Sequence, residues 1–246
     1  MTPVNDPYFR VELLSAMPNP QQLIWAAMHQ DYSEDFVADE RDRFPDEERA
    51  GDLIVKHLLS AGRGHWGPVE HVQIMFNVGY FPHSTMQQLR THRVGVSFDC
   101  QSFRFSGERI VDVVHGERDV EEVFYLRPAG ETYCDRQGKR YIYTADQRNQ
   151  DLDWCKAACQ RYAQRISEGL SEEHARGLIP FDVRQHFVMS CNARSLMHIL
   201  DLRAKADAQL EIQDLCQRLW PHFQAWMPRV ADWYESNRLG KARLSP

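Results

Sequence analysis

The sequence lacks the features that mark several whole classes of protein. No apolar run approaches the roughly 18 residues of a membrane-spanning helix, and the first residues show no basic region followed by an apolar stretch. We therefore expect no membrane span and no secretory signal. Basic residues are not in excess, since 29 Lys and Arg stand against 35 Asp and Glu and leave a net charge of −6. This balance disfavours a nucleic-acid-binding protein.

Familiar structural frameworks are missing too. The glycine patterns GxGxxG and P-loop, which cradle phosphates, do not occur. The six cysteines show no sign of a secreted disulfide framework, so reduced thiols in a cytoplasmic protein are the expectation. Cys155 and Cys159 fall on one face of an expected helix. We assign them to core packing and expect no metal, because no further ligands of that kind lie nearby.

Hydrophobic patterning predicts both helices and strands, and no repeat or low-complexity linker divides residues 1–246, so a single domain is expected. Residues 69–80 alternate apolar β-formers with other residues, which indicates a half-buried strand that ends by Pro82. Residues 181–190 are expected to be extended, 95–107 to form a polar loop, and 122–145 to form a β-ribbon. Helices are expected from Pro20, over 46–61 with Gly62 beyond the end, and over 84–93, 151–168, 192–204 and 206–230, the last kinked or broken at Pro221.

Three polar segments stand out from this framework. The first places His65, Glu70 and His71 within seven residues at the mouth of the expected strand. Such a set favours a ligand or cofactor contact, and zinc is one candidate. The alternative is a loop whose polar groups cap the strand.

The second segment places Arg90 and Arg93 at the end of a short helix, followed by Ser97, Ser102 and Arg104. Guanidinium groups and hydroxyls suit phosphate oxygens, so this segment is a candidate phosphate clamp. A surface cluster of salt bridges explains it equally well. The aromatic residues of the loop favour a ligand that contains a ring; they are Phe98, Phe103 and Phe105.

The third segment is the expected helix at 192–204. One stripe of it carries Asn192 and Arg203 at its ends and apolar residues between them, while Arg194 and His198 lie on another side. Polar groups on a buried helix need partners, and either a ligand or an aspartate such as Asp201 would serve.

Taken together, these segments resemble the flavin-dependent thymidylate synthases. The resemblance rests on residues 88–93 (QLRTHR) with Ser102-Phe103-Arg104, and on residues 192–197 (NARSLM) ending in Leu202-Arg203. Residues 65–71 and 208–212 support it. It implies an α+β fold in which a small antiparallel or mixed sheet is flanked by helices, with 116–145 as an insertion. It also implies a homotetramer with shared active sites that makes dTMP from dUMP, taking carbon from methylene-tetrahydrofolate and hydride from FAD that NADPH reduces.

The resemblance assigns roles to individual residues, with Arg203 as the catalytic group that stabilises ionisation of the pyrimidine at N3. The residues implied for dUMP are Gln88, Leu89, Arg90, Thr91, Cys100, Gln101, Ser102, Phe103, Arg104, Arg176 and Arg203. The residues implied for FAD are His65, Gly67, Glu70, Thr91, His92, Arg93, Asn192, Ala193, Arg194 and His198.

This chain departs from the family pattern at three places. The pattern reads Arg-His-Arg, then seven residues, then Ser; here Thr91 replaces the first arginine, and eight residues separate Arg93 from Ser102. Arg90 is the candidate replacement for the lost guanidinium. Gly67 stands where the family commonly has a hydroxyl residue.

Three other functions compete with this one. Cys100 would serve as nucleophile in an enzyme of the same outcome but different chemistry, if Arg93 or Arg104 lowered the pKa of its thiol. The Arg/His segment with its aromatic loop would suit a nucleic-acid-binding protein. A non-catalytic flavin or nucleotide sensor is the third alternative.

Overall fold

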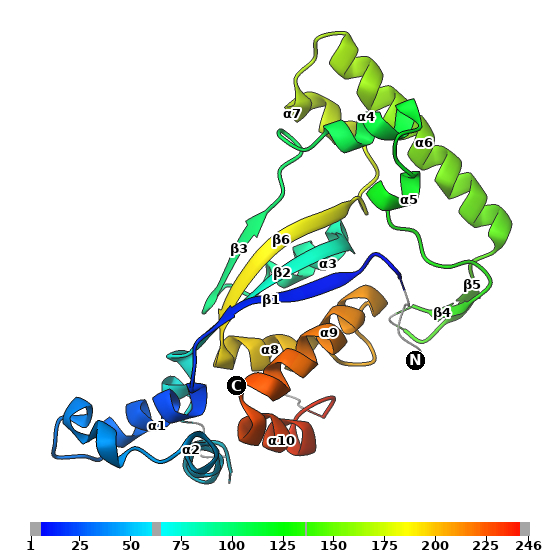
Figure 1. Ribbon diagram of the computed structural model, residues 1–246. Helices are drawn as coiled ribbons and strands as arrows, with labels where there is room; N and C mark the ends of the chain where they lie inside the picture. The colour runs from blue at the N-terminus through cyan, green and yellow to red at the C-terminus, as the bar shows by residue number, and fades with distance from the viewer. Residues whose placement is uncertain (1–5, 61–64, 136, 242–246) are drawn as a thin grey trace.

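A four-stranded antiparallel sheet forms the centre of the computed structural model, which describes residues 6–60, 65–135 and 137–241 (Figure 1). Its strand order is β1-β2-β6-β3, and a separate pair, β4 and β5, forms a ribbon. The mixture of small antiparallel sheets and helices confirms the predicted α+β class. The strands are β1 (Arg10–Ala16), β2 (Gln73–Pro82), β3 (Val96–Cys100), β4 (Thr132–Cys134), β5 (Arg140–Ile142) and β6 (Arg184–Asn192).

Helices precede, link and follow these strands. They are α1 (Pro20–Gln30), α2 (Glu47–Ile54), α3 (His83–Leu89), α4 (Glu108–His115), α5 (Val120–Val123), α6 (Ala145–Ser167), α7 (Glu172–Ala175), α8 (Ala193–Arg203), α9 (Leu210–Trp226) and α10 (Pro228–Asn237). A π-helical turn continues α2 over Val55–Leu59, and short 3-10 turns cover Val37–Arg43, Gly67–Glu70 and Arg176–Leu178. Across the described ranges, no helix is both long and apolar enough to cross a membrane.

One face of the sheet is buried beneath helices. Ile74, Phe76 and Val78 of β2 are buried in the core cluster that includes residues of α3, α8 and α9. The alternate β2 residues, among them Met75 and Asn77, are exposed on the other face. The predicted alternation of this strand is therefore confirmed, and it explains why three helices gather on one side (Figure 1).

A second hydrophobic cluster lies beyond one end of the sheet, where α4, α5, α6 and α7 pack together (Figure 1). Cys155 and Cys159 of α6 are buried in it, which confirms their assignment to the core. Burial raises the pKa of the Cys155 thiol to about 11 and that of the Cys159 thiol to about 12.

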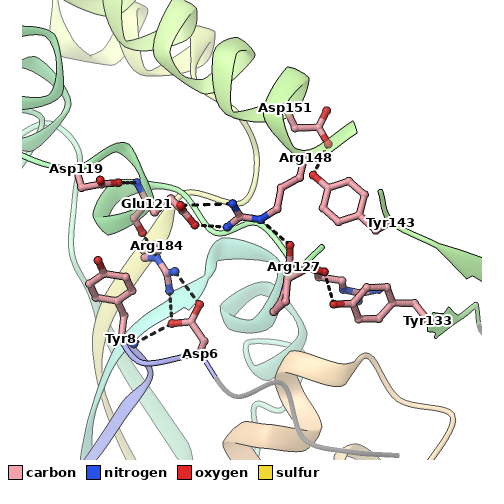
Figure 2. A network of polar contacts seen from close by, with 11 residues as sticks. Asp6, Tyr8, Asp119, Glu121, Arg127, Tyr133, Tyr143, Arg148, Asp151 and Arg184 are labelled. Carbon is pink, nitrogen blue, oxygen red and sulfur yellow. Dashed lines mark hydrogen bonds and ion pairs between the residues drawn. The ribbon is translucent and has the colours of Figure 1, made fainter. Parts of the chain in front are cut away.

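Polar contacts attach this second cluster to the sheet (Figure 2). Arg184 of β6 donates from Nε to the carbonyl oxygen of Glu121 at 2.7 Å. Arg148 of α6 pairs with the Glu121 carboxylate and donates from Nε to the carbonyl oxygen of Arg127 at 3.0 Å. Glu121 is thereby linked to both β6 and α6, and Arg127 is linked to α6.

The structure differs from several predictions in the position or the type of the secondary-structure element. The first arm of the predicted ribbon, 122–127, contains the end of α5 and one isolated bridge, Phe124 to Val183; the true partner of β5 is β4. The predicted loop at 95–107 contains the edge strand β3. The strand β1 was not predicted. The helix that begins at 210 continues through Pro221, and the break comes at Met227, the residue before Pro228.

Other boundaries moved by a few residues. The strand expected at 69–80 spans Gln73–Pro82, and the helix expected at 84–93 spans His83–Leu89. The helix expected at 151–168 starts earlier, at Ala145, because Thr144 and Gln147 form a capping box there. The helix expected at 46–61 starts at Glu47, with Asp46 as its N-cap, whereas its predicted stop at Gly62 lies outside the described residues.

Candidate functional site

The first cavity lies between α3, the end of β3 and the turn that follows α7, and has a volume of about 500 Å³. It collects six residues of the predicted nucleotide set: Arg90, Cys100, Gln101, Ser102, Phe103 and Arg176. Arg90 and Arg176 are 86 positions apart in the sequence, and the fold brings their guanidinium-bearing side chains to one cavity. The two guanidinium cations and the hydroxyl of Ser102 line the same cavity, so they form a site suited to an anion.

Two buried polar atoms in the walls of the first cavity have no hydrogen-bond partner among the residues that the structure describes: Nδ1 of His83 and Oε1 of Gln101. Buried polar groups are nearly always paired, so unpaired ones beside a cavity mark positions where a ligand or water would bind. Burial, reinforced by the charge of Arg90, lowers the pKa of His83. Its imidazole is therefore held neutral.

Cys100 lines the first cavity but lacks the character of a nucleophile. Burial raises the pKa of its thiol, and the opposing effect of the Arg90 charge is smaller. The thiolate is the reactive form of cysteine, so this environment disfavours the covalent alternative.

The second cavity, of about 390 Å³, lies between the end of α3 and the start of α8. It collects six residues of the predicted flavin set: Glu70, Thr91, His92, Arg93, Arg194 and His198. An adjoining third cavity, of about 690 Å³, shares Thr91, His92 and Arg93 with it and also reaches Arg90. The predicted flavin and nucleotide sets are thus neighbours along one surface.

Charge is distributed unevenly in the second cavity. Arg194 forms an ion pair with Glu70, which reduces its net charge. His92 and His198 lie edge to face with their ring centroids 4.9 Å apart. Burial and the neighbouring Arg203 lower the pKa of His92 to about 4, and burial lowers that of His198. Both rings are neutral near pH 7.

Arg203, the last residue of α8, reaches back to the end of α3. Its Nε donates to Nε2 of His92 at 3.1 Å, and its Nη2 donates to the Thr91 hydroxyl at 3.0 Å and to the carbonyl oxygen of Gln88 at 3.2 Å. The predicted catalytic arginine is therefore held by residues of both predicted sets.

Asn192 has a structural role at the start of α8. Its Oδ1 accepts a hydrogen bond from the backbone N–H of Ser195 at 2.8 Å, which caps the helix. Gly95 lies over this cap with φ +65°, and a Cβ there would come within 2.2 Å of Asn192 Nδ2. Only glycine therefore fits the turn that leads from α3 into β3.

Some predicted residues lie outside these cavities. Leu89 and Ala193 are fully buried in the core and line none of the three cavities. His65 pairs with Asp31, and Arg104 pairs with Glu173. Gly67 borders open space. For the metal alternative at 65–71, the ranges that the structure describes hold no group of three or more His, Cys, Asp or Glu placed to bind an ion.

Sequence reasoning missed several residues of the cavity walls, including His83, Phe181 and Gln185 in the first cavity and Ser195 in the second. One signal was available. His83 directly precedes the helix predicted at 84–93 and lies seven residues, about two helical turns, before Arg90, so extending that helix by one residue places both on one face.

Comparison with known proteins assigns the chain to a family. Residues 12–229 match the family model described as Thymidylate synthase complementing protein. A flavin-dependent thymidylate synthase of Haloarcula marismortui is 33% identical over 251 residues, covering 96% of this chain and 99% of the relative. One of Halobacterium salinarum is also 33% identical, covering 96% of this chain and 100% of the relative.

Solved structures share the fold at lower identity. A UMP/dUMP methylase PolB from Streptomyces cacaoi, bound with 5-Br UMP, superposes with a TM-score of 0.68 at 24% identity and covers 97% of this chain and 96% of that chain. The same methylase bound with 5-Br dUMP gives a TM-score of 0.70 at 23% identity, covering 97% of both chains. The α+β arrangement described above is therefore a known one.

Proposed function

Because the chain belongs to the family of flavin-dependent thymidylate synthases, we propose that it catalyses the reductive methylation of dUMP to dTMP. Methylene-tetrahydrofolate is the proposed carbon donor and NADPH the proposed reductant. FAD, when bound, supplies the hydride that completes the methyl group.

The observation that carries this proposal is the convergence of Arg90, Ser102 and Arg176 on one cavity of about 500 Å³. A nucleoside monophosphate brings a dianion and a flat ring. Two guanidinium groups bind the phosphate, the Ser102 hydroxyl adds a donor, and the unpaired atoms of His83 and Gln101 offer further polar contacts.

The second and third cavities fit a flavin dinucleotide in the chemistry of their donors. Arg93 and Arg194 supply positive charge for a diphosphate, and the neutral rings of His92 and His198 offer flat surfaces and hydrogen bonds beside them. We propose that the flavin is held by Thr91, His92, Arg93, Arg194 and His198. Asn192 caps the helix that carries Arg194 and His198.

Arg203 is the proposed catalytic residue. Its partners are a neutral imidazole, a hydroxyl and a carbonyl, so its charge is not cancelled by any of the three. Uracil C5 is a weak nucleophile, and withdrawal of the N3 proton makes the ring electron-rich. A fixed guanidinium beside the ring stabilises that anion, and preorganised charge of this kind is a large catalytic factor.

The decisive experiment is anaerobic incubation of the purified protein with dUMP, methylene-tetrahydrofolate and NADPH. We expect thymidylate to form and the protein to carry flavin absorbance. Arg176→Ala should raise the KM for dUMP by about tenfold or more, corresponding to the loss of at least about 1.4 kcal/mol. Arg10→Ala is the matched control, because Arg10 is exposed and pairs with Glu12. Failure of the purified protein to bind FAD or to form thymidylate would refute the proposal.

The active sites are further proposed to be shared within a homotetramer. The second cavity has a volume of about 390 Å³, at the small end of the range for ligand sites, whereas a flavin dinucleotide is a large ligand with two ring systems. A second subunit would complete the site. Dilution to monomer should then release FAD, as sedimentation combined with flavin absorbance would show. A monomer that keeps one FAD per chain would rule out the shared site.

A further inference from the structure

We infer that Thr91 is a positioning residue whose hydroxyl fixes the direction of the Arg203 guanidinium toward the substrate. The inference rests on the proposed function of Arg203. It adds a role for Thr91 that is distinct from contact with nucleotide or flavin.

The hydrogen atoms of this cluster have only one consistent arrangement. The single proton of the Thr91 hydroxyl goes to the carbonyl oxygen of Gln88, at 2.7 Å. A lone pair of the same oxygen then faces Nη2 of Arg203, which donates to it at 3.0 Å. The hydroxyl is therefore oriented by the backbone of α3 before it accepts from the arginine.

The same logic fixes His92. Its Nε2 accepts from Nε of Arg203 at 3.1 Å, so that nitrogen carries no proton and the proton lies on Nδ1. Thr91 and His92 are adjacent, and they hold two different nitrogens of one guanidinium. Rotation of the planar group about its bonds would break both contacts together.

Three of the five N–H groups of Arg203 are consumed in this way: Nε–H by His92, and the two of Nη2 by Gln88 and Thr91. Within the part of the chain that the structure describes, no hydrogen bond or ion pair engages Nη1. The two N–H groups of Nη1 are thus the ones left for a ligand, although Arg203 itself is not among the residues that line the three cavities.

The three groups that accept hydrogen bonds from Arg203 carry no negative charge. A carboxylate in place of Thr91 would neutralise Arg203, as Glu70 does for Arg194. A hydroxyl holds the group in place and leaves its positive charge available to an anionic ring. Thr91 therefore combines orientation with retention of charge, which a hydrocarbon or an acid at this position would not.

Two substitutions separate the hydroxyl from the shape of the side chain. Thr91→Val keeps the shape and removes both hydrogen bonds, whereas Thr91→Ser keeps the hydroxyl. We expect Thr91→Val to lower kcat by about tenfold, equal to about 1.4 kcal/mol, with the KM for dUMP changed less than threefold. Thr91→Ser should stay within about threefold of the unmodified enzyme in kcat.

Thr85→Val is the matched control. Thr85 lies on α3, six residues before Thr91, and is fully buried, and its hydroxyl has no hydrogen-bond partner among the described residues. This variant makes the same chemical change without touching Arg203, and it should leave kcat within about twofold.

A second measurement needs no turnover. The flavoprotein is treated with phenylglyoxal, which condenses with accessible guanidinium groups and does so more slowly where their nitrogens are hydrogen-bonded, and the modification rate at Arg203 is followed by peptide mass spectrometry. We expect a several-fold faster rate in Thr91→Val and no change in Thr91→Ser or Thr85→Val.

The outcomes are distinct. Equal labelling rates and equal kcat in Thr91→Val and the unmodified enzyme would overturn the inference, and so would a loss of kcat in Thr91→Ser as large as that in Thr91→Val. Absence of thymidylate in the unmodified enzyme would refute the proposed function, while the labelling rates would still decide whether Thr91 holds Arg203.

Discussion

Asp6 and Arg184 form a bidentate ion pair that joins the beginning of the described chain to β6 (Figure 2). Nη1 of Arg184 lies 3.1 Å from Oδ1 of Asp6, and Nη2 lies 2.8 Å from Oδ2. Both side chains are buried: that of Arg184 is 2% exposed and that of Asp6 is 8% exposed. The guanidinium also donates to the carbonyl oxygen of Tyr80, a residue held at φ 67°. One arginine thereby connects Asp6 with Tyr80, the residue of β2 at which the register with β6 shifts.

Asp6→Asn should destabilise the protein strongly, because it leaves the Arg184 charge buried without a counterion. We expect the free energy of unfolding to fall by about 3–5 kcal/mol. Chemical denaturation of the variant measures this. Glu12→Gln is the control, since the Arg10–Glu12 pair is exposed and such pairs contribute about 1 kcal/mol or less. Similar losses in both variants would contradict the role of the buried pair.

Stability should depend on pH through His92. The pKa of this residue is about 4 in the folded protein against 6.5 for an unperturbed histidine. The unfolded chain therefore gains a proton as the pH falls below 6.5, whereas the folded chain does not, and folding loses up to about 3 kcal/mol by pH 4.

The measurement compares the unmodified protein with His92→Gln, whose amide oxygen accepts from Arg203 without titrating. The difference in Tm between the two should shift in favour of His92→Gln as the pH falls from 6.5 to 4. A difference that stays constant over this range would show that His92 does not carry the effect. His198, whose pKa is also lowered, is present in both proteins and cancels.

Elements with a complete local signal were predictable. The alternation in β2, the proline at the start of α1 and the apolar face of α2 all led to confirmed elements. The strand β1 was missed because a bulge between Leu13 and Ser15 breaks its alternation. The strand β3 does alternate, with Val96, Phe98 and Cys100 on one face, and its polar residues suggested a loop instead.

Other errors required tertiary information. Residues 122–127 have strong β-formers, but their partner is a single residue of another segment, Val183, which the local sequence does not reveal. Pro221 is tolerated inside α9, because the loss of one backbone hydrogen bond is outweighed by an apolar face whose Leu219 and Phe223 are buried. Local rules overstate the effect of a proline when packing holds the helix on both sides.

The candidate site was predicted as two sets of residues, and the cavities bring together much of each set. The direct contacts could not be predicted. The partner of Arg203 was expected to be a ligand or an aspartate, whereas its hydrogen bonds go to Gln88, Thr91 and His92, more than 100 positions earlier. Spacing along one helix carries no information about which residues of another helix face it.

Cys100→Ala should keep thymidylate formation, with kcat reduced only a few-fold. The thiol lies at the cavity wall, but burial raises its pKa, and so the thiolate needed for attack is scarce near pH 7. Turnover and bound FAD are measured on the same preparation. Complete loss of turnover in a folded variant that retains FAD would restore the covalent alternative.

The last prediction concerns the charge of Arg203. Arg203→Ala should bind FAD and allow its reduction by NADPH, yet form thymidylate at least about 100-fold more slowly, because stabilising charge matters most when the ring becomes anionic. The rate of flavin bleaching under anaerobic conditions and the rate of thymidylate formation separate the two steps. Arg203→Lys should recover little, since one ammonium group cannot contact His92, Thr91 and the substrate together. Near-normal turnover in Arg203→Ala would exclude this residue from the chemistry, and the role inferred for Thr91 in catalysis would be excluded with it.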